Sequence, residues 1–90
     1  MSRAELVEKV TSLIINAVQL RHVDRKQITA DTSLREGGLE LDSVDILEVV
    51  IAIEHEFGVK VTDAEAGKVH FRTIGTIADF ILSQKAEGAR

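Results

Sequence analysis

The sequence predicts an all-α domain, a small antiparallel four-helix bundle with three longer helices, one short helix and a long first loop. Apolar residues recur at helical spacing along most of the chain. Its 90 residues are enough for one domain, and 44% hydrophobic residues are enough to build a core. We therefore expect residues 1–90 to form a single domain, with a loose C-terminal tail over about 84–90.

Composition excludes several classes of function. The chain has no Cys, and hence no disulfide and no thiol of its own. Without Trp or Tyr it offers no aromatic platform for stacked nucleic-acid bases. Its longest apolar run, 49–53, is far too short for a membrane span, and residues 1–20 do not resemble a signal peptide. We expect a cytoplasmic protein without a membrane span.

Negative charge is concentrated in one segment. The net charge is −4 at pH 7, and residues 40–57 hold six carboxylates without a Lys or Arg: Glu40, Asp42, Asp45, Glu48, Glu54 and Glu56. Such a segment repels a phosphate backbone and favours a basic protein partner. We therefore expect no nucleic-acid partner.

The first helix is predicted over about 3–20, where apolar residues follow i, i+3, i+4 spacing. Residues 21–42 then lose this period and contain several turn-forming residues. A loop of about 22 residues is long for a compact domain. Three apolar side chains are expected to pin it to the core: Ile28, Leu34 and Leu39.

The clearest helix is predicted over 43–57. Asp42 suits the N-cap, Asp45 stands at the spacing of a capping box although Asp is short for that role, and Gly58 suits the stop. At about 100° per residue, one side forms a core stripe: Ile46, Val49, Val50, Ile53 and Phe57. The other side carries Val44, Glu48, Ile51 and His55. Folding gives no reason for apolar residues there, so this side is a candidate docking face.

Two further helices are predicted after this one. Residues 59–61 alternate apolar and polar and are expected to be extended, followed by a short helix over about 62–68. Thr73 is expected to cap a last helix over about 74–83. Gly75 within this helix lowers its stability by roughly 1 kcal/mol relative to Ala. A glycine at such a position is explained by a close contact with another helix.

Metal and hydrolytic sites find little support. The three histidines are far apart in sequence. The carboxylates of Asp42, Asp45 and Glu48 resemble the start of a calcium loop, but the segment lacks the Gly at position six and the Glu at position twelve of such a loop. Ser43 and His55 would be separated by about 18 Å along one helix, too far for a catalytic hydrogen bond. We expect no metal site, no catalytic residue and no enzymatic activity.

Ser43 allows two interpretations. It can simply begin a helix behind the Asp42 cap. It can also accept a modification, because it follows a Gly-containing loop and its hydroxyl is expected to be exposed. A phosphodiester there would face the free N–H groups and the positive end of the helix dipole, beside the docking face. The agreement of these features favours the second interpretation.

Residues 38–45 resemble the Gly-x-x-x-Asp-Ser-Leu motif of acyl carrier proteins, with Val44 in place of the usual Leu. Residues 46–58, which end in Glu-His-Glu-Phe-Gly, are similar to the recognition helix of that family. Residues 31–34 and 73–77 resemble the loop before the motif and the last helix. The resemblance extends over about 5–83, nearly the whole chain.

This resemblance implies that Ser43, next to Asp42 of the motif, bears 4′-phosphopantetheine. A phosphopantetheinyl transferase would donate the group from coenzyme A with Mg²⁺, and its thiol would carry acyl groups as thioesters. The chain would then be a non-catalytic carrier and a monomer. Its consumers would be enzymes of fatty-acid, polyketide or specialised lipid and cell-envelope biosynthesis, with aminoacyl or peptidyl cargo as an alternative.

The resemblance also implies a partner-binding face. Acyl-transferring, ketosynthase-type or acyl-activating enzymes with basic patches would contact Asp42, Val44, Asp45, Glu48, Ile51, Glu54 and His55. His55 replaces an acid common in the family, so this face is less negative and can respond to pH between about 6 and 7. The pI of about 5.3 and the basic residues Arg21, Arg25 and Lys26 favour a specialised carrier over the housekeeping one.

Two other functions remain as alternatives. In a non-covalent helical interaction module Ser43 is only a cap, so Ser43→Ala would leave function intact or slightly weakened by the lost cap. A small hydrolase would turn over substrate as an isolated chain, although no base for Ser43 is visible in the sequence. A carrier, in contrast, would lose all function with Ser43→Ala.

Overall fold

The computed structural model describes residues 2–18, 25–35, 37–61, 67 and 69–88. These residues form the helices α1 (Arg3–Val18), α2 (Ser43–Phe57) and α4 (Ile74–Gly88), with a short 3-10 helix, η1 (Arg25–Gln27), in the first loop. The described segments contain no β-strand, only an isolated bridge between Ser33 and Thr73. The predicted small helical bundle is thus confirmed.

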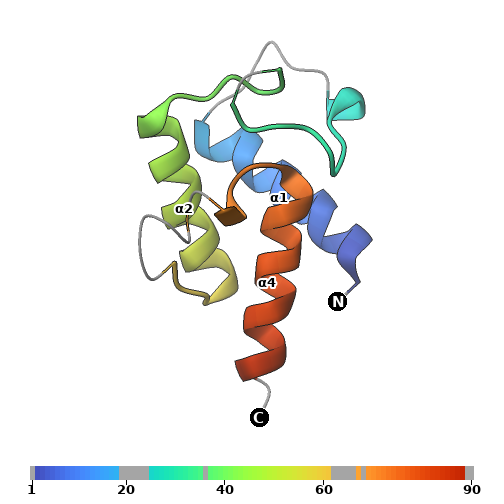
Figure 1. Ribbon diagram of the computed structural model, residues 1–90, viewed down its shortest axis with the longest axis vertical. Coiled ribbons are helices and arrows are strands. Elements are labelled where there is room, and N and C mark those ends of the chain that lie inside the picture. The colour runs from blue at the N-terminus through green and yellow to red at the C-terminus, as the bar shows by residue number, and fades with distance from the viewer. Residues whose placement is uncertain (1, 19–24, 36, 62–66, 68, 89–90) are drawn as a thin grey trace.

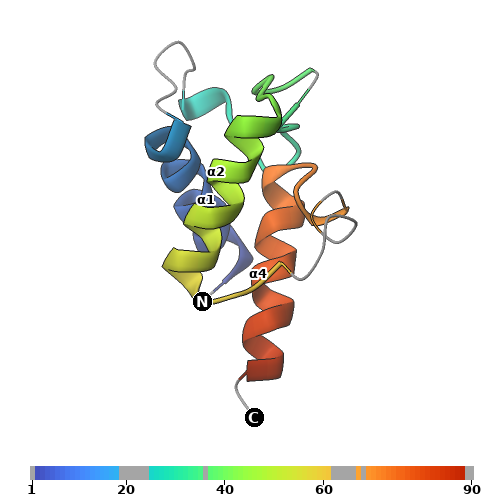
Figure 2. The same ribbon diagram turned by 90° about the vertical axis from the view of Figure 1, so that its left-hand side faces the viewer.

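The helices are arranged antiparallel about α1. Both α2 and α4 begin at the end of the molecule that the long loop covers and run away from it, whereas α1 runs toward it (Figures 1 and 2). α1 packs against both of them. The buried apolar core draws on all three helices and on the connecting segments: Leu6, Val10, Ile14, Leu34, Leu39, Leu41, Val49, Ile53, Phe57, Val59, Phe71, Ile74, Ile77, Ala78, Phe80 and Ile81.

The helix ends agree with the sequence except at the C-terminus. α2 has the predicted bounds, and α1 is described up to Val18, because residues 19–20 lie outside the described part. α4 continues to Gly88, so the predicted end near 83 is wrong, and residues 84–88 are helical where a loose tail was expected. Its last turns extend past the end of α2 in both views (Figures 1 and 2). They contain good helix formers but no apolar stripe, so periodicity gives no sign of them.

Only part of the segment between α2 and α4 is described. Residues 62–66 and 68, most of the predicted short helix, lie outside it. Gly67, Val69 and His70 have helical backbone, and the Phe71 N–H donates to the Gly67 carbonyl at 2.9 Å. Residues 58–61 are neither helix nor strand, and within them Val59 is buried against the core.

The long loop is part of the core, as predicted. Leu34 and Leu39 are buried and Ile28 is half-buried. Backbone hydrogen bonds, written donor first, fix the loop to itself and to the start of α4: Leu39 N to Ser33 O, Leu41 N to Leu34 O, Leu34 N to Arg72 O, Ile74 N to Thr32 O and Gly75 N to Ala30 O, all between 2.7 and 3.2 Å. The segment just before α2 is therefore held to the start of α4.

Gly75 makes a close contact, but mainly with this loop rather than with a helix backbone. A Cβ at position 75 would lie 2.9 Å from the Ala30 carbonyl oxygen and 2.6 Å from Nη2 of Arg3 in α1. Arg3 Nε donates to Asp79 Oδ1 in α4 at 2.7 Å. This hydrogen bond and the charge of Asp79 raise the pKa of Arg3 above its ordinary value. The predicted helix contact at Gly75 is thus limited to one side chain.

Candidate functional site

The start of α2 is fixed by a reciprocal cap. The Asp45 N–H donates to Asp42 Oδ1 at 2.8 Å, and the Asp42 N–H donates to Asp45 Oδ2 at 3.4 Å. Asp therefore completes the capping box in spite of its short side chain. At the other end Gly58 is left-handed, with φ 68°, and its N–H donates to the Glu54 carbonyl at 3.0 Å. Both predicted ends of α2 are confirmed with their physical causes.

Ser43 is the first residue of α2, and its side chain is exposed. The cap acceptor is the Asp42 carboxylate, and within the described part of the chain the Ser43 hydroxyl makes no hydrogen bond. Ser43 thus begins the helix behind the Asp42 cap, as the first interpretation has it, and only the idea that Ser43 is itself the cap is wrong. The hydroxyl is open to a reagent from solvent.

This position fits a phosphodiester. A primary hydroxyl at the first turn of a 15-residue helix places an attached anion beside the positive end of the helix dipole. The described residues contain no group of His, Cys, Asp and Glu side chains suited to a metal ion.

The docking face of α2 carries an apolar patch of three residues. Val44, Leu47 and Ile51 are 65%, 57% and 55% exposed. Helical periodicity predicted Val44 and Ile51 on this face but not Leu47, which lies at its margin on a helical projection. Its position three residues after Val44 and four before Ile51 is the signal that would have found it. The predicted core stripe is buried at Val49, Ile53 and Phe57 and half-buried at Ile46 and Val50.

The predicted polar contacts around this patch differ in their surroundings. Asp42, Glu48 and His55 are exposed. Asp45 is half-buried and belongs to the capping box. Glu54 is half-buried, and its Oε2 accepts the Val61 N–H at 2.8 Å, so it also connects α2 to the following segment. The hydrogen bonds of Asp45 and Glu54 within the protein are sufficient to explain these two residues. Glu48 and His55 make no such contact with the described residues.

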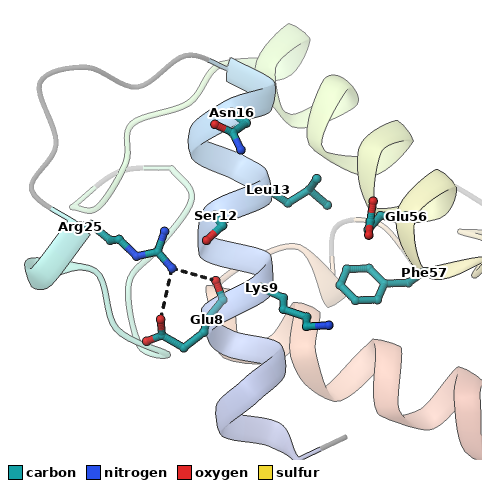
Figure 3. Close-up of a pocket in the computed structure, with 8 residues that line it drawn as sticks. All are labelled: Glu8, Lys9, Ser12, Leu13, Asn16, Arg25, Glu56 and Phe57. Carbon is teal, nitrogen blue, oxygen red and sulfur yellow. Dashed lines mark hydrogen bonds and ion pairs between the residues drawn. The ribbon is translucent and has the colours of Figure 1, made fainter.

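An open groove of about 370 Å³ lies elsewhere on the molecule, between α1, η1 and the end of α2 (Figure 3). Its lining is mostly polar or charged: Glu8, Lys9, Ser12, Leu13, Asn16, Arg25, Glu56 and Phe57. Arg25 Nη2 donates to Glu8 Oε2 at 3.2 Å within it, and Arg21 of the predicted basic cluster lies outside the described residues. Ser43 is not among the residues that line the groove, and Phe57 in its lining is about 21 Å from Ser43 by helix rise.

Comparison with known proteins agrees with this geometry. The family model of the phosphopantetheine attachment site matches residues 8–81. An acyl carrier protein of Thermosynechococcus vestitus is 34% identical over 96% of this chain and 99% of its own length, and one of Thermotoga maritima is 39% identical over 89% and 91%. A solved structure of an acyl carrier protein from Enterococcus faecalis has a TM-score of 0.69 and 31% identity, covering 93% of this chain and 99% of that one. The chain therefore belongs to the acyl carrier protein family, whose members are non-catalytic carriers with covalently bound 4′-phosphopantetheine.

Proposed function

We propose that this chain carries acyl intermediates as thioesters on a 4′-phosphopantetheine group attached to Ser43. The observation that supports this most is the Ser43 hydroxyl itself. It is exposed at the start of α2, within the motif of the family, and makes no hydrogen bond to any residue that the structure describes. The attached group supplies the thiol that a chain without Cys lacks. Enzymes of fatty-acid, polyketide or specialised lipid and cell-envelope synthesis would consume the cargo.

Loading requires one displacement at phosphorus. Ser43 Oγ attacks the phosphorus that bears pantetheine in coenzyme A, and the bond from that phosphorus to the second phosphate breaks. Adenosine 3′,5′-bisphosphate leaves, and the hydroxyl proton passes to a base of the phosphopantetheinyl transferase, which also binds Mg²⁺. The capping box holds the first turn of α2 in place for this step, and the free amides of that turn favour the new anion.

We further propose that partner enzymes dock on the apolar patch of Val44, Leu47 and Ile51. The exposed carboxylates of Asp42 and Glu48 flank it and favour a basic partner surface. Asp45, Glu54 and His55 complete the expected contact set, as acyl-transferring, ketosynthase-type or acyl-activating enzymes would read it. No helix within the described ranges combines the length and apolar character that crossing a membrane requires.

The test is loading of the purified chain. Wild type and Ser43→Ala are incubated with coenzyme A, Mg²⁺ and a broad-specificity phosphopantetheinyl transferase, and intact mass and free thiol are measured. We expect wild type to gain one phosphopantetheinyl group and one thiol per chain, and Ser43→Ala to gain neither. Because the Ser43 hydroxyl makes no hydrogen bond to the described residues, the variant should unfold like wild type.

Ser12→Ala is the matched control, since it removes another helical hydroxyl and should load normally. Failure of the folded wild type to gain mass, with the transferase active on a second carrier, would contradict the proposal and favour the non-covalent interaction module. Loading of Ser43→Ala would place the attachment at another residue.

A further inference from the structure

Glu40 has an unusual backbone conformation for its residue type. Among the described residues, three have φ in the left-handed region: Gly37 at 79°, Gly58 at 68° and Glu40 at 54°. Glycine adopts this region at no steric cost, whereas a residue with a Cβ is disfavoured there. The chain thus uses glycine at two of these positions and a glutamate at the third, where glycine would suit the backbone better.

The surrounding backbone enforces this conformation. The Glu40 N–H donates to the Arg35 carbonyl at 2.9 Å, and the N–H groups of its two neighbours donate to Ser33 and Leu34 carbonyls at 2.8 Å. Those neighbours, Leu39 and Leu41, are both only 5% exposed. The backbone bonds and the buried leucines depend on no atom of the Glu40 side chain, so the fold does not require a glutamate at this position.

The Glu40 side chain is exposed and has no partner within the described part of the chain, whose ion pairs lie at Arg3–Asp79 and Arg25–Glu8. Three residues span at most about 11 Å, so its Cα lies within that distance of the Ser43 Cα. The left-handed backbone therefore places an exposed carboxylate, without a partner among the described residues, close to the hydroxyl proposed to accept the prosthetic group.

We propose that Glu40 is a recognition residue for the phosphopantetheinyl transferase and pairs with a cationic side chain of that enzyme. This inference rests on the proposed attachment at Ser43. The transferase must bring Ser43 Oγ itself into contact with coenzyme A, so its surface has to cover the residues around Ser43. Enzymes that act later reach the cargo at the end of the arm and can dock farther along α2. An exposed charge near the edge of such a contact acts mainly on association.

The test separates charge from backbone strain with two variants. Glu40→Gln removes the charge and keeps the strain, and Glu40→Gly removes both. Glu56→Gln is the control, because it makes the same change in net charge on an exposed residue near the far end of α2. For each apo protein, loading is measured by intact mass against carrier concentration, with coenzyme A, Mg²⁺ and the broad-specificity transferase, and thermal unfolding is measured alongside.

We expect both Glu40 variants to lower kcat/KM about three- to fivefold through KM, with kcat unchanged, as for an exposed charge pair. The loss should shrink in about 0.5 M salt, where the screening length falls below about 5 Å. Glu40→Gly should also raise the Tm, and Glu56→Gln should load like wild type. If Glu40 had a merely structural role, Glu40→Gly would again raise the Tm but would load at least as well as wild type, so loading is the measurement that separates the two.

A second readout does not depend on loading of the variant. The chain with Ser43→Ala cannot be loaded but should compete with wild type for the transferase, and adding Glu40→Gln should raise its inhibition constant by the same three- to fivefold. Equal loading of wild type and Glu40→Gly, or an equal loss in Glu56→Gln, would overturn the role of Glu40 while leaving attachment at Ser43 intact. Absence of loading in wild type would overturn both.

Discussion

At the scale of single residues, Gly75 shows how one contact opposes a general helix preference. Alanine within a helix is favoured over glycine by about 1 kcal/mol. At position 75, however, a Cβ would lie only 2.9 Å from the Ala30 carbonyl oxygen. The Gly75 N–H donates to that same oxygen at 2.7 Å. A methyl group here would push the long loop away from the start of α4.

We expect Gly75→Ala to destabilise the protein by about 1–3 kcal/mol, because the displaced backbone outweighs the gain in helix propensity. Urea denaturation measures this change as a lower midpoint. Gly67→Ala is the control, since among the described residues its Cβ would meet only Val61 Cγ1 at 3.5 Å, an ordinary contact. A more stable Gly75→Ala would show that the loop moves at little cost.

Some single residues were readable from the sequence and others were not. Asp42 and Gly58 were predicted because capping depends on residue type and short spacing, and Ser43 because its motif is local. The left-handed φ of Glu40 was not predicted, because glycine is the usual sign of that conformation. Its cause is the set of backbone hydrogen bonds that residues 39–41 donate to the carbonyls of Ser33, Leu34 and Arg35.

At the scale of elements, α2 has two apolar surfaces, one buried and one exposed. One packs in the core through Val49, Ile53 and Phe57. The other is the apolar patch, whose side chains are more than half exposed. Burial stabilises the fold only through the first surface. We therefore expect substitutions on the buried surface to lower the free energy of unfolding, and substitutions on the exposed patch to affect recognition by partner enzymes.

We expect Leu47→Gln to change the free energy of unfolding by no more than about 0.5 kcal/mol. Loading by the transferase should nevertheless slow, because an apolar contact is lost. Ile53→Ala, at a fully buried position of the same helix, should instead cost about 2–5 kcal/mol. The measurements are urea unfolding and kcat/KM for loading. An unchanged kcat/KM in Leu47→Gln would show that this enzyme does not use the patch.

The elements were predictable wherever their signals were local. The bounds of α2 followed from its caps and its stripe. The end of α4 did not, because its last turns are stabilised by propensity and carry no apolar period. η1 was missed for a similar reason: three polar residues, Arg25–Gln27, give no periodic signal.

At the scale of the whole molecule, the long loop connects the start of α2 to the start of α4. Leu34 lies at the centre of this connection, because its N–H donates to Arg72 and its carbonyl accepts from Leu41. The sequence predicted that Leu34 and Leu39 would be buried. It did not reveal the bonds to the start of α4, which join residues 38 to 45 positions apart and leave no local pattern.

This connection should be visible in hydrogen exchange. We expect the amides of Leu34, Leu39 and Leu41 to exchange at least about a hundredfold more slowly than in an unstructured chain, as in a helix core. Lys60, exposed in an irregular segment, should exchange near the unprotected rate. NMR-detected exchange measures both. Rapid exchange at the three leucines would show that the loop opens independently of the helices.

The apolar patch on α2 also governs how the purified protein behaves at high concentration. At pH 7 the net charge of −4 keeps copies apart even though three apolar side chains remain in water. Near the pI of about 5.3 that repulsion disappears while the patch is unchanged. We therefore expect the colloidal stability of this carrier to fall as the buffer approaches its pI, so the surface proposed for enzyme docking would also limit its solubility.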